Sequence, residues 1–195
     1  MRSKPNREVL KTLSSLYSEI SATVEDRRGL VYSPLPWLIL LLSNGMSETE
    51  HRDLFQRIRS ETSIEARMAS TISVNPVHAV LTATRMLTVH EYYFQGGTES
   101  PYTMGIFTLK QAENQRDILS EITTRLRTHF DVSRLILSTG SLPLSVSLER
   151  VVGVLRENSV DYIRGLLRHV NIGVGVDYRA LDALSKAEEN LLRGD

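Results

Sequence analysis

The sequence contains no cysteine among its 195 residues. Disulfide bonds, thiolate zinc sites and cysteine nucleophiles are therefore excluded. Long apolar runs are also missing: the longest, 35–42, is interrupted by Pro36 and is too short to span a bilayer as a helix. The opening segment MRSKPNREVLKTL lacks the apolar core of a signal peptide. We therefore expect any contact with a membrane to be peripheral.

Lysine is scarce, because the chain has four lysines but nineteen arginines. The formal net charge is nevertheless zero, which argues against nucleic-acid binding driven by overall charge. Arginine suits bidentate contacts with phosphate or carboxylate groups. The imbalance is thus explained either by such contacts or by the base composition of the gene, and the sequence leaves both explanations open.

The sequence shows no catalytic or metal-binding motif. No two of the five histidines have metal-ligand spacing, and neither HExxH nor G-x-S-x-G occurs. Gly173-Val174-Gly175 matches part of a dinucleotide fingerprint, but it lacks the third glycine, and we interpret it as a loop. The sequence therefore predicts a protein that is not an enzyme and that has no metal and no cofactor.

Apolar residues recur at helical spacing along most of the chain. The short apolar run 104–109 fits a helix or a strand, and we favour a helix from its context. Because few segments alternate in polarity, we predict an all-α fold, a multi-helix bundle. The predicted helices cover residues 6–24, 77–93, 114–130, which 131–137 continues or restarts, 147–170 with a break at 158–159, and 178–192, with a further helical turn at 63–68.

Residues 33–59 are predicted to form the central helix pair. Ser33 can cap a helix that Pro34 opens, and the following residues to Leu42 are apolar on all sides, which predicts a buried helix. Asn44-Gly45 ends it. Ser47 and the acidic residues after it then predict the start of a second helix.

The segment 138–143, rich in serine with one glycine and one proline, is the best candidate for a linker. It predicts two small helical domains. The first, 1–137, is built round the 33–59 helix pair, and the second is 144–195.

Arginines on the predicted helices are the candidate lipid- or phosphate-binding residues. Stripes of arginine can bind the phosphate of lipid or nucleic acid. The alternative is a solvated helix face on which nearby glutamates balance the charge. The candidates are Arg52, Arg57, Arg59, Arg125, Arg127, Arg134, Arg156, Arg164 and Arg168.

The first part of the chain resembles the matrix proteins of orthomyxoviruses, the influenza-type viruses. The resemblance rests on Ser33-Pro34-Leu35, the apolar stretch after it, Ser47-Glu48 and Phe55-Gln56. The short chain fits a distant member, similar to those of isaviruses or thogotoviruses. Two features of that family differ here: its strongly basic helix is reduced to 85–90, and its Cys/His cluster cannot form without cysteine.

The resemblance implies a viral matrix protein, a structural protein of the virion that binds acidic lipid on the inner face of the envelope. Such a protein self-associates into a layer and contacts the viral ribonucleoprotein or RNA. Its expected location is the virion interior, the host cytoplasm, the inner face of the plasma membrane and the nucleus. The alternative is a soluble helical adaptor or regulatory module whose apolar groove accepts a partner helix.

Overall fold

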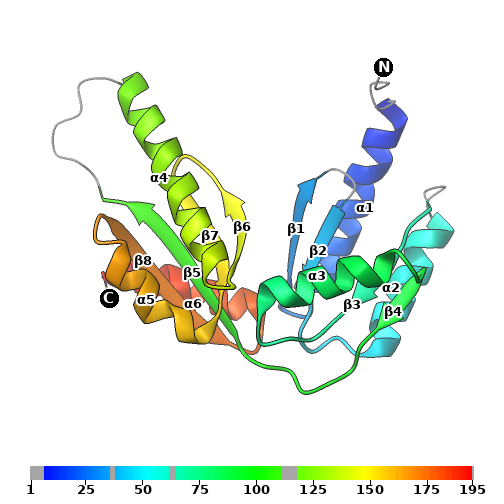
Figure 1. The fold of residues 1–195 in the computed structure, drawn as a ribbon. Coiled ribbons are helices and arrows are strands. Elements are labelled where there is room, and N and C mark those ends of the chain that lie inside the picture. Colours follow the sequence, from blue (N-terminus) through cyan, green and yellow to red (C-terminus); the bar gives the residue numbers. More distant parts are fainter. Residues whose placement is uncertain (1–6, 36–37, 62–64, 111–117, 195) are drawn as a thin grey trace.

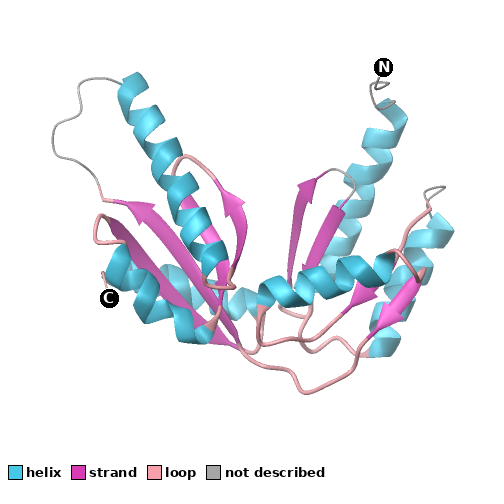
Figure 2. Ribbon diagram, viewed as in Figure 1, coloured by secondary structure: helices cyan, strands magenta, loops and turns pink. Residues whose placement is uncertain are grey.

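The computed structural model describes residues 7–35, 38–61, 65–110 and 118–194. In Figure 1 two halves form the arms of a V. Both arms contain helices and strands (Figure 2), so the protein is mixed α/β and the predicted all-α bundle is wrong.

The N-terminal half comprises α1 (Arg7–Glu25), β1 (Leu30–Leu35), β2 (Leu38–Leu42), α2 (Glu48–Glu61), β3 (Met68–Ser70), α3 (Pro76–Leu87) and β4 (Tyr92–Phe94). The C-terminal half comprises β5 (Tyr102–Leu109), α4 (Ile118–Ser138), β6 (Leu142–Val146), β7 (Arg150–Leu155), the 3₁₀ turn η1 (Glu157–Ser159), α5 (Val160–Leu166), β8 (Val170–Asp177) and α6 (Ala180–Arg193).

The C-terminal half is built on a four-stranded sheet in the order β6-β7-β5-β8. Every neighbouring pair in this sheet is antiparallel. The chain runs β5-α4-β6-β7-α5-β8, which with this strand order is the ferredoxin-like topology. Helix α6 follows as an addition.

Helices cover both faces of this sheet. On one face Met104 packs in a cluster with Ala183 of α6. On the other face Phe107 packs with Ile136 of α4 and Ile163 of α5. Because successive strand residues point to opposite faces, β5 is buried on both sides and forms the middle layer of three.

Two segments that the sequence predicts as helix are strands of this sheet. The run 104–109 lies in β5, between β7 and β8. Strand β7 occupies residues 150–155, which fall inside the predicted helix 147–170. A strand buried on both faces shows a continuous apolar run, so the alternation that marks a strand was missing. At the predicted break, 158–159, the chain forms the 3₁₀ turn η1, which leads directly into α5 at Val160; helix begins only after β7.

Strand β8 contains Gly173 and Gly175, so the interpretation of this segment as a loop is wrong. A Cβ atom on Gly173 would lie 2.1 Å from the Ala187 carbonyl oxygen, and one on Gly175 would lie 2.1 Å from that of Ala183. No real Cβ makes such a contact. The two glycines therefore allow α6 to lie directly against the strand.

The N-terminal half has elements in the same order as the C-terminal half, starting from its first helix: helix, hairpin, helix, strand, helix. Among the described residues it has no counterpart of β5. Its strands form two separate pairs, antiparallel β1-β2 and parallel β3-β4. Ile39 and Leu41 of β2 and Met68 of β3 nevertheless pack against the same core cluster, which includes Leu16 of α1 and Leu54 of α2.

The predicted apolar helix from Ser33 to Leu42 is instead the hairpin β1-β2, with Leu30 opposite Leu42. The apolar run is too short for a buried helix but matches the length of a buried strand. Pro36 and Trp37 lie outside the described residues. The helix predicted to start at Ser47 is confirmed as α2.

The amphipathic helices are otherwise confirmed as α1, α3, α4 and α6, with changed ends. The predicted helix 77–93 stops at Leu87, and its last residues form β4. Of the predicted helical turn at 63–68, residues 63–64 lie outside the described part of the chain, and Met68 is the first residue of strand β3. The segment 138–143 contains the end of α4, a turn at Gly140 and the start of β6.

The two halves are joined at the N-terminus of α6. The Leu181 amide there donates to the Arg28 carbonyl at 3.0 Å, and Arg28 Nε donates to Asp182 Oδ1 at 2.9 Å. Arg28, at φ 59°, occupies the left-handed conformation that glycine usually adopts after the end of a helix. Tyr32 of β1 packs against the cluster that contains α6, and burial raises the pKa of its hydroxyl to about 12.

Gly175→Val should destabilise the protein by about 2–3 kcal/mol or prevent folding, because the side chain would displace α6 from β8. Gly165→Ala in α5 is the control, since a Cβ there has nothing within 4 Å and alanine favours a helix. Urea denaturation measures both variants. Wild-type stability of Gly175→Val would contradict the close contact.

Candidate functional site

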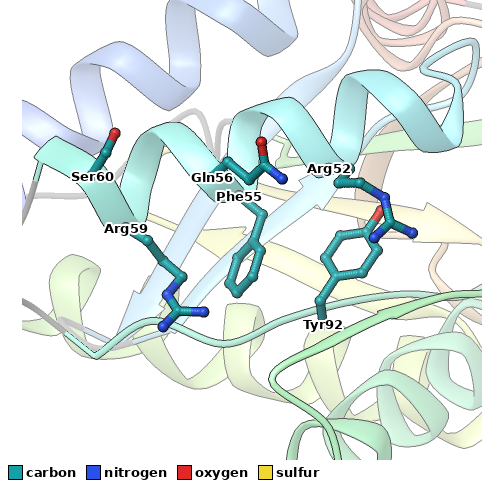
Figure 3. Close-up of a pocket in the computed structure, with 6 residues that line it drawn as sticks. All are labelled: Arg52, Phe55, Gln56, Arg59, Ser60 and Tyr92. Atoms are coloured by element: carbon teal, nitrogen blue, oxygen red, sulfur yellow. The ribbon is translucent and has the colours of Figure 1, made fainter.

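A cavity of about 400 Å³ lies between α2 and β4 (Figure 3). This volume is within the range of small-molecule sites. Most of its wall comes from one face of α2, because residues three and four apart on a helix are neighbours. The lining residues are Arg52, Phe55, Gln56, Arg59, Ser60 and Tyr92.

Helix α2 is fixed at its N-terminus by a reciprocal capping interaction. The Ser47 amide donates to Glu50 Oε2 at 2.8 Å, and the Glu50 amide donates to Ser47 Oγ at 3.3 Å. These bonds from Ser47, together with its hydroxyl, hold the pKa of the Glu50 carboxyl below its usual value. The cap therefore sets where the cavity face of α2 begins.

His51 anchors the same helix from inside. It is 3% exposed and therefore lies on the buried side of the helix. One ring nitrogen lies 2.9 Å from Ser43 Oγ and the other 2.8 Å from the Ser47 carbonyl oxygen. With both nitrogens engaged, His51 has a structural role beneath the cavity.

Tyr92 forms the β4 side of the cavity. Its ring centroid lies 5.4 Å from that of Phe55, and the Arg52 guanidinium carbon lies 4.8 Å from the Tyr92 ring centroid. The Tyr92 hydroxyl donates to the Glu48 carbonyl oxygen at 3.2 Å. Partial burial raises the pKa of this hydroxyl, and the Arg52 charge acts against the rise.

Arg59 lies at the other end of the cavity, so that the Phe55 ring is between Arg59 and Tyr92 (Figure 3). Its guanidinium carbon is 5.7 Å from the Phe55 ring centroid, and its Nη1 is 2.9 Å from Glu91 Oε2. Two guanidinium groups thus lie beside two aromatic rings. Such a combination suits a ligand with a planar ring and an anionic group.

Both cavity arginines are paired with carboxylates. Arg52 Nη2 lies 2.7 Å from Glu48 Oε1, and the side chains in this pair and in the Arg59–Glu91 pair are about half exposed. Exposed ion pairs contribute at most about 1 kcal/mol, so a phosphate group can replace the carboxylate at low cost. In the absence of a ligand, each ion pair holds its guanidinium group beside an aromatic ring.

The other arginine candidates lie elsewhere. Arg57 points from α2 to Glu19 of α1, 3.6 Å away. Arg125, Arg127 and Arg134 are on α4, where Arg125 pairs with Glu121 and Arg134 lies over Phe130. Arg164 and Arg168 line a second, smaller cavity near α5, whereas Arg156 precedes η1. The structure therefore brings together Arg52 with Arg59, and Arg164 with Arg168.

Within the described ranges, no group of three or more His, Cys, Asp or Glu side chains could hold a metal ion. In the same part of the chain, no helix is both long and apolar enough to cross a bilayer. The sequence analysis missed the aromatic half of the cavity, Phe55 and Tyr92. The available signal is Tyr92-Tyr93-Phe94, an aromatic cluster typical of a strand, whereas the helical spacing before it predicts a helix to residue 93.

A family model described as GTP cyclohydrolase III matches residues 2–96, just under half of the chain. The matched range contains every residue that lines the cavity between α2 and β4. Comparison with individual curated sequences gives no match.

This match corrects the functional predictions. The family is one of cellular enzymes, so the resemblance to orthomyxovirus matrix proteins is wrong. The predicted structural role at an acidic membrane, the adaptor alternative and the prediction that the protein is not an enzyme are wrong for the same reason. The partners and the location inferred with the matrix protein stay predictions.

Glu50→Gln should lower the stability at neutral pH, because the neutral side chain loses the charge-assisted bonds from Ser47 and the ion pair with Arg27. The lowered pKa of Glu50 means that its contribution is present above the unfolded value, near 4.5, and is lost as the pH falls through the folded value. The stability difference from wild type should therefore shrink from pH 7 toward pH 4 and below. Denaturant titrations across that range measure it, and a constant difference would contradict the assignment.

Proposed function

We propose that this protein is an enzyme of the GTP cyclohydrolase III type and that it holds GTP in the cavity between α2 and β4. The observation that carries the proposal is the family match over residues 2–96, which encloses the whole cavity. A cyclohydrolase opens a ring by adding water across one of its C–N bonds. Because the ring that is opened belongs to GTP, the binding site must hold the purine and also the triphosphate attached to its ribose.

The cavity offers contacts of both kinds. The faces and edges of Phe55 and Tyr92 suit a purine ring, and Gln56 supplies an amide donor and acceptor for its polar edge. Arg52 and Arg59 suit phosphate oxygens, because a guanidinium binds them with two parallel hydrogen bonds. A volume of about 400 Å³ accommodates a base and part of the phosphate chain.

The arginine pair provides the test. With GTP as substrate, Arg52→Ala/Arg59→Ala should raise KM about tenfold or more, because charge-assisted hydrogen bonds contribute roughly 1.5–3 kcal/mol each. Loss of the guanine ultraviolet band, with chromatography of the nucleotide, measures turnover. Arg57→Ala is the control on the same helix, since it pairs with Glu19 outside the cavity and should leave KM unchanged.

Two results would count against the proposal in different ways. If the wild-type protein neither binds nor consumes GTP in preference to ATP, the proposed activity is wrong. If GTP is consumed and the double variant behaves like Arg57→Ala, the activity stands and the cavity is not its site. Thermal denaturation of each variant separates loss of binding from loss of folding.

A further inference from the structure

A second cavity, of about 270 Å³, lies in the C-terminal half, on the other arm of the V from the α2–β4 cavity (Figure 1). It is formed where the last turn of α5, the start of β8, the end of β5 and the last turn of α6 meet. It lies outside the range of the family match. The lining residues are Lys110, Arg164, Leu167, Arg168, Val170, Asn171, Ile172, Leu191 and Gly194.

Three cations, Lys110, Arg164 and Arg168, line this small volume, and none of the described residues that line it is acidic. Over the described ranges, neither Arg164 nor Arg168 forms an ion pair with a carboxylate, in contrast to Arg52 and Arg59 of the first cavity. Among the described residues, positive charge is therefore concentrated here without a paired carboxylate, although the net charge of the chain is zero.

Lys110 is fixed in place by the turn that follows α5. Its Nζ donates to the Arg168 carbonyl oxygen at 2.9 Å, and its amide donates to the His169 carbonyl oxygen at 3.3 Å. An ammonium group has three protons, so two remain for a ligand. Arg164 lies in the last turn of the seven-residue helix α5, where a cation suits the C-terminal dipole. Lys110 and Arg168 lie outside the helix and are surplus to that role.

The floor of the cavity is apolar. Leu167 and Val170 are 7% and 6% exposed, and Ile172 and Leu191 lie beside them. Charges next to an apolar floor are screened less than charges in open water, so an anion there is attracted more strongly. Asn171 adds neutral donors at the same rim.

We propose that this cavity is a binding site for the diphosphate group of a small ligand, with Lys110, Arg164 and Arg168 as its contacts. The source is either free inorganic diphosphate or the phosphate chain of a nucleotide. The proposal is independent of the function proposed above, because the two cavities share no residue and lie on different halves.

Isothermal titration of the full chain with inorganic diphosphate, at low and at physiological salt, tests the site. Arg164→Ala/Arg168→Ala should weaken binding at least tenfold, and salt should weaken wild-type binding. The matched control is Arg127→Ala/Arg156→Ala, which removes the same charge from exposed positions outside the cavity and should stay within about twofold of wild type. Thermal denaturation confirms that both variants fold.

A second arm uses GTP and GMP in place of diphosphate on the Arg52→Ala/Arg59→Ala background. Binding of GTP but not GMP there, lost on adding Arg164→Ala/Arg168→Ala, identifies a nucleotide phosphate chain as the source. Binding of diphosphate alone identifies the free ion. Absence of diphosphate and GTP binding, or equal weakening by the cavity and the control pairs, would overturn the proposal.

Discussion

The contact between α6 and β8 determines how the two halves are held together. Gly173 and Gly175 remove the side chains that would separate strand from helix, and Ala183 and Ala187 pack into the space. The axis of α6 is thereby fixed on the sheet. Its first turn then reaches the N-terminal half, where the Arg28 carbonyl accepts from Leu181. A helix N-terminus needs partners for its free amides, and here the other half of the molecule supplies one.

This arrangement matters most for the N-terminal half, whose sheet is divided. Strands β2 and β3 belong to different strand pairs, yet Ile39 and Met68 pack against the same cluster of α1 and α2. Side-chain packing against α1 and α2 holds β2 and β3 on the same side of these helices, and no hydrogen bonds join the two strands to each other in a sheet. The α2–β4 cavity therefore depends on the position of α2, which its cap, His51 and Leu54 all fix.

The sequence predicts the helices of this protein far better than its strands, for a physical reason. Helices α1, α2, α3, α4 and α6 each expose one polar face, so their apolar residues recur at helical spacing. The strands at 104–109 and 38–42 have few polar residues to mark a face, and their apolar runs resemble buried helix.

The site was predictable to a similar degree. Arg52 and Arg59 are two of the nine arginines that the sequence offers as phosphate-binding candidates, and both line one cavity in the structure. Their aromatic partner Tyr92 lies far along the chain, and only the folding of β4 beside α2 brings it there. Local spacing carries no information about such a contact. Function was missed for the same reason, because a basic helix without its aromatic partner resembles a lipid-binding surface.

The arginine-rich composition has a different meaning in the folded protein from the one it suggests in the sequence. Many arginines in the described part of the chain lie near a carboxylate, as Arg57 of α2 does with Glu19 and Arg150 of β7 does with Glu188. Local ion pairs thus balance much of the charge in the described part of the chain. Arg127 and Arg156 form no ion pair there either, so an arginine without a carboxylate is informative only where it shares a cavity with other cations. Arg164 and Arg168, next to Lys110 and above an apolar floor, are such a case, and this is why we propose the smaller cavity as an anion site.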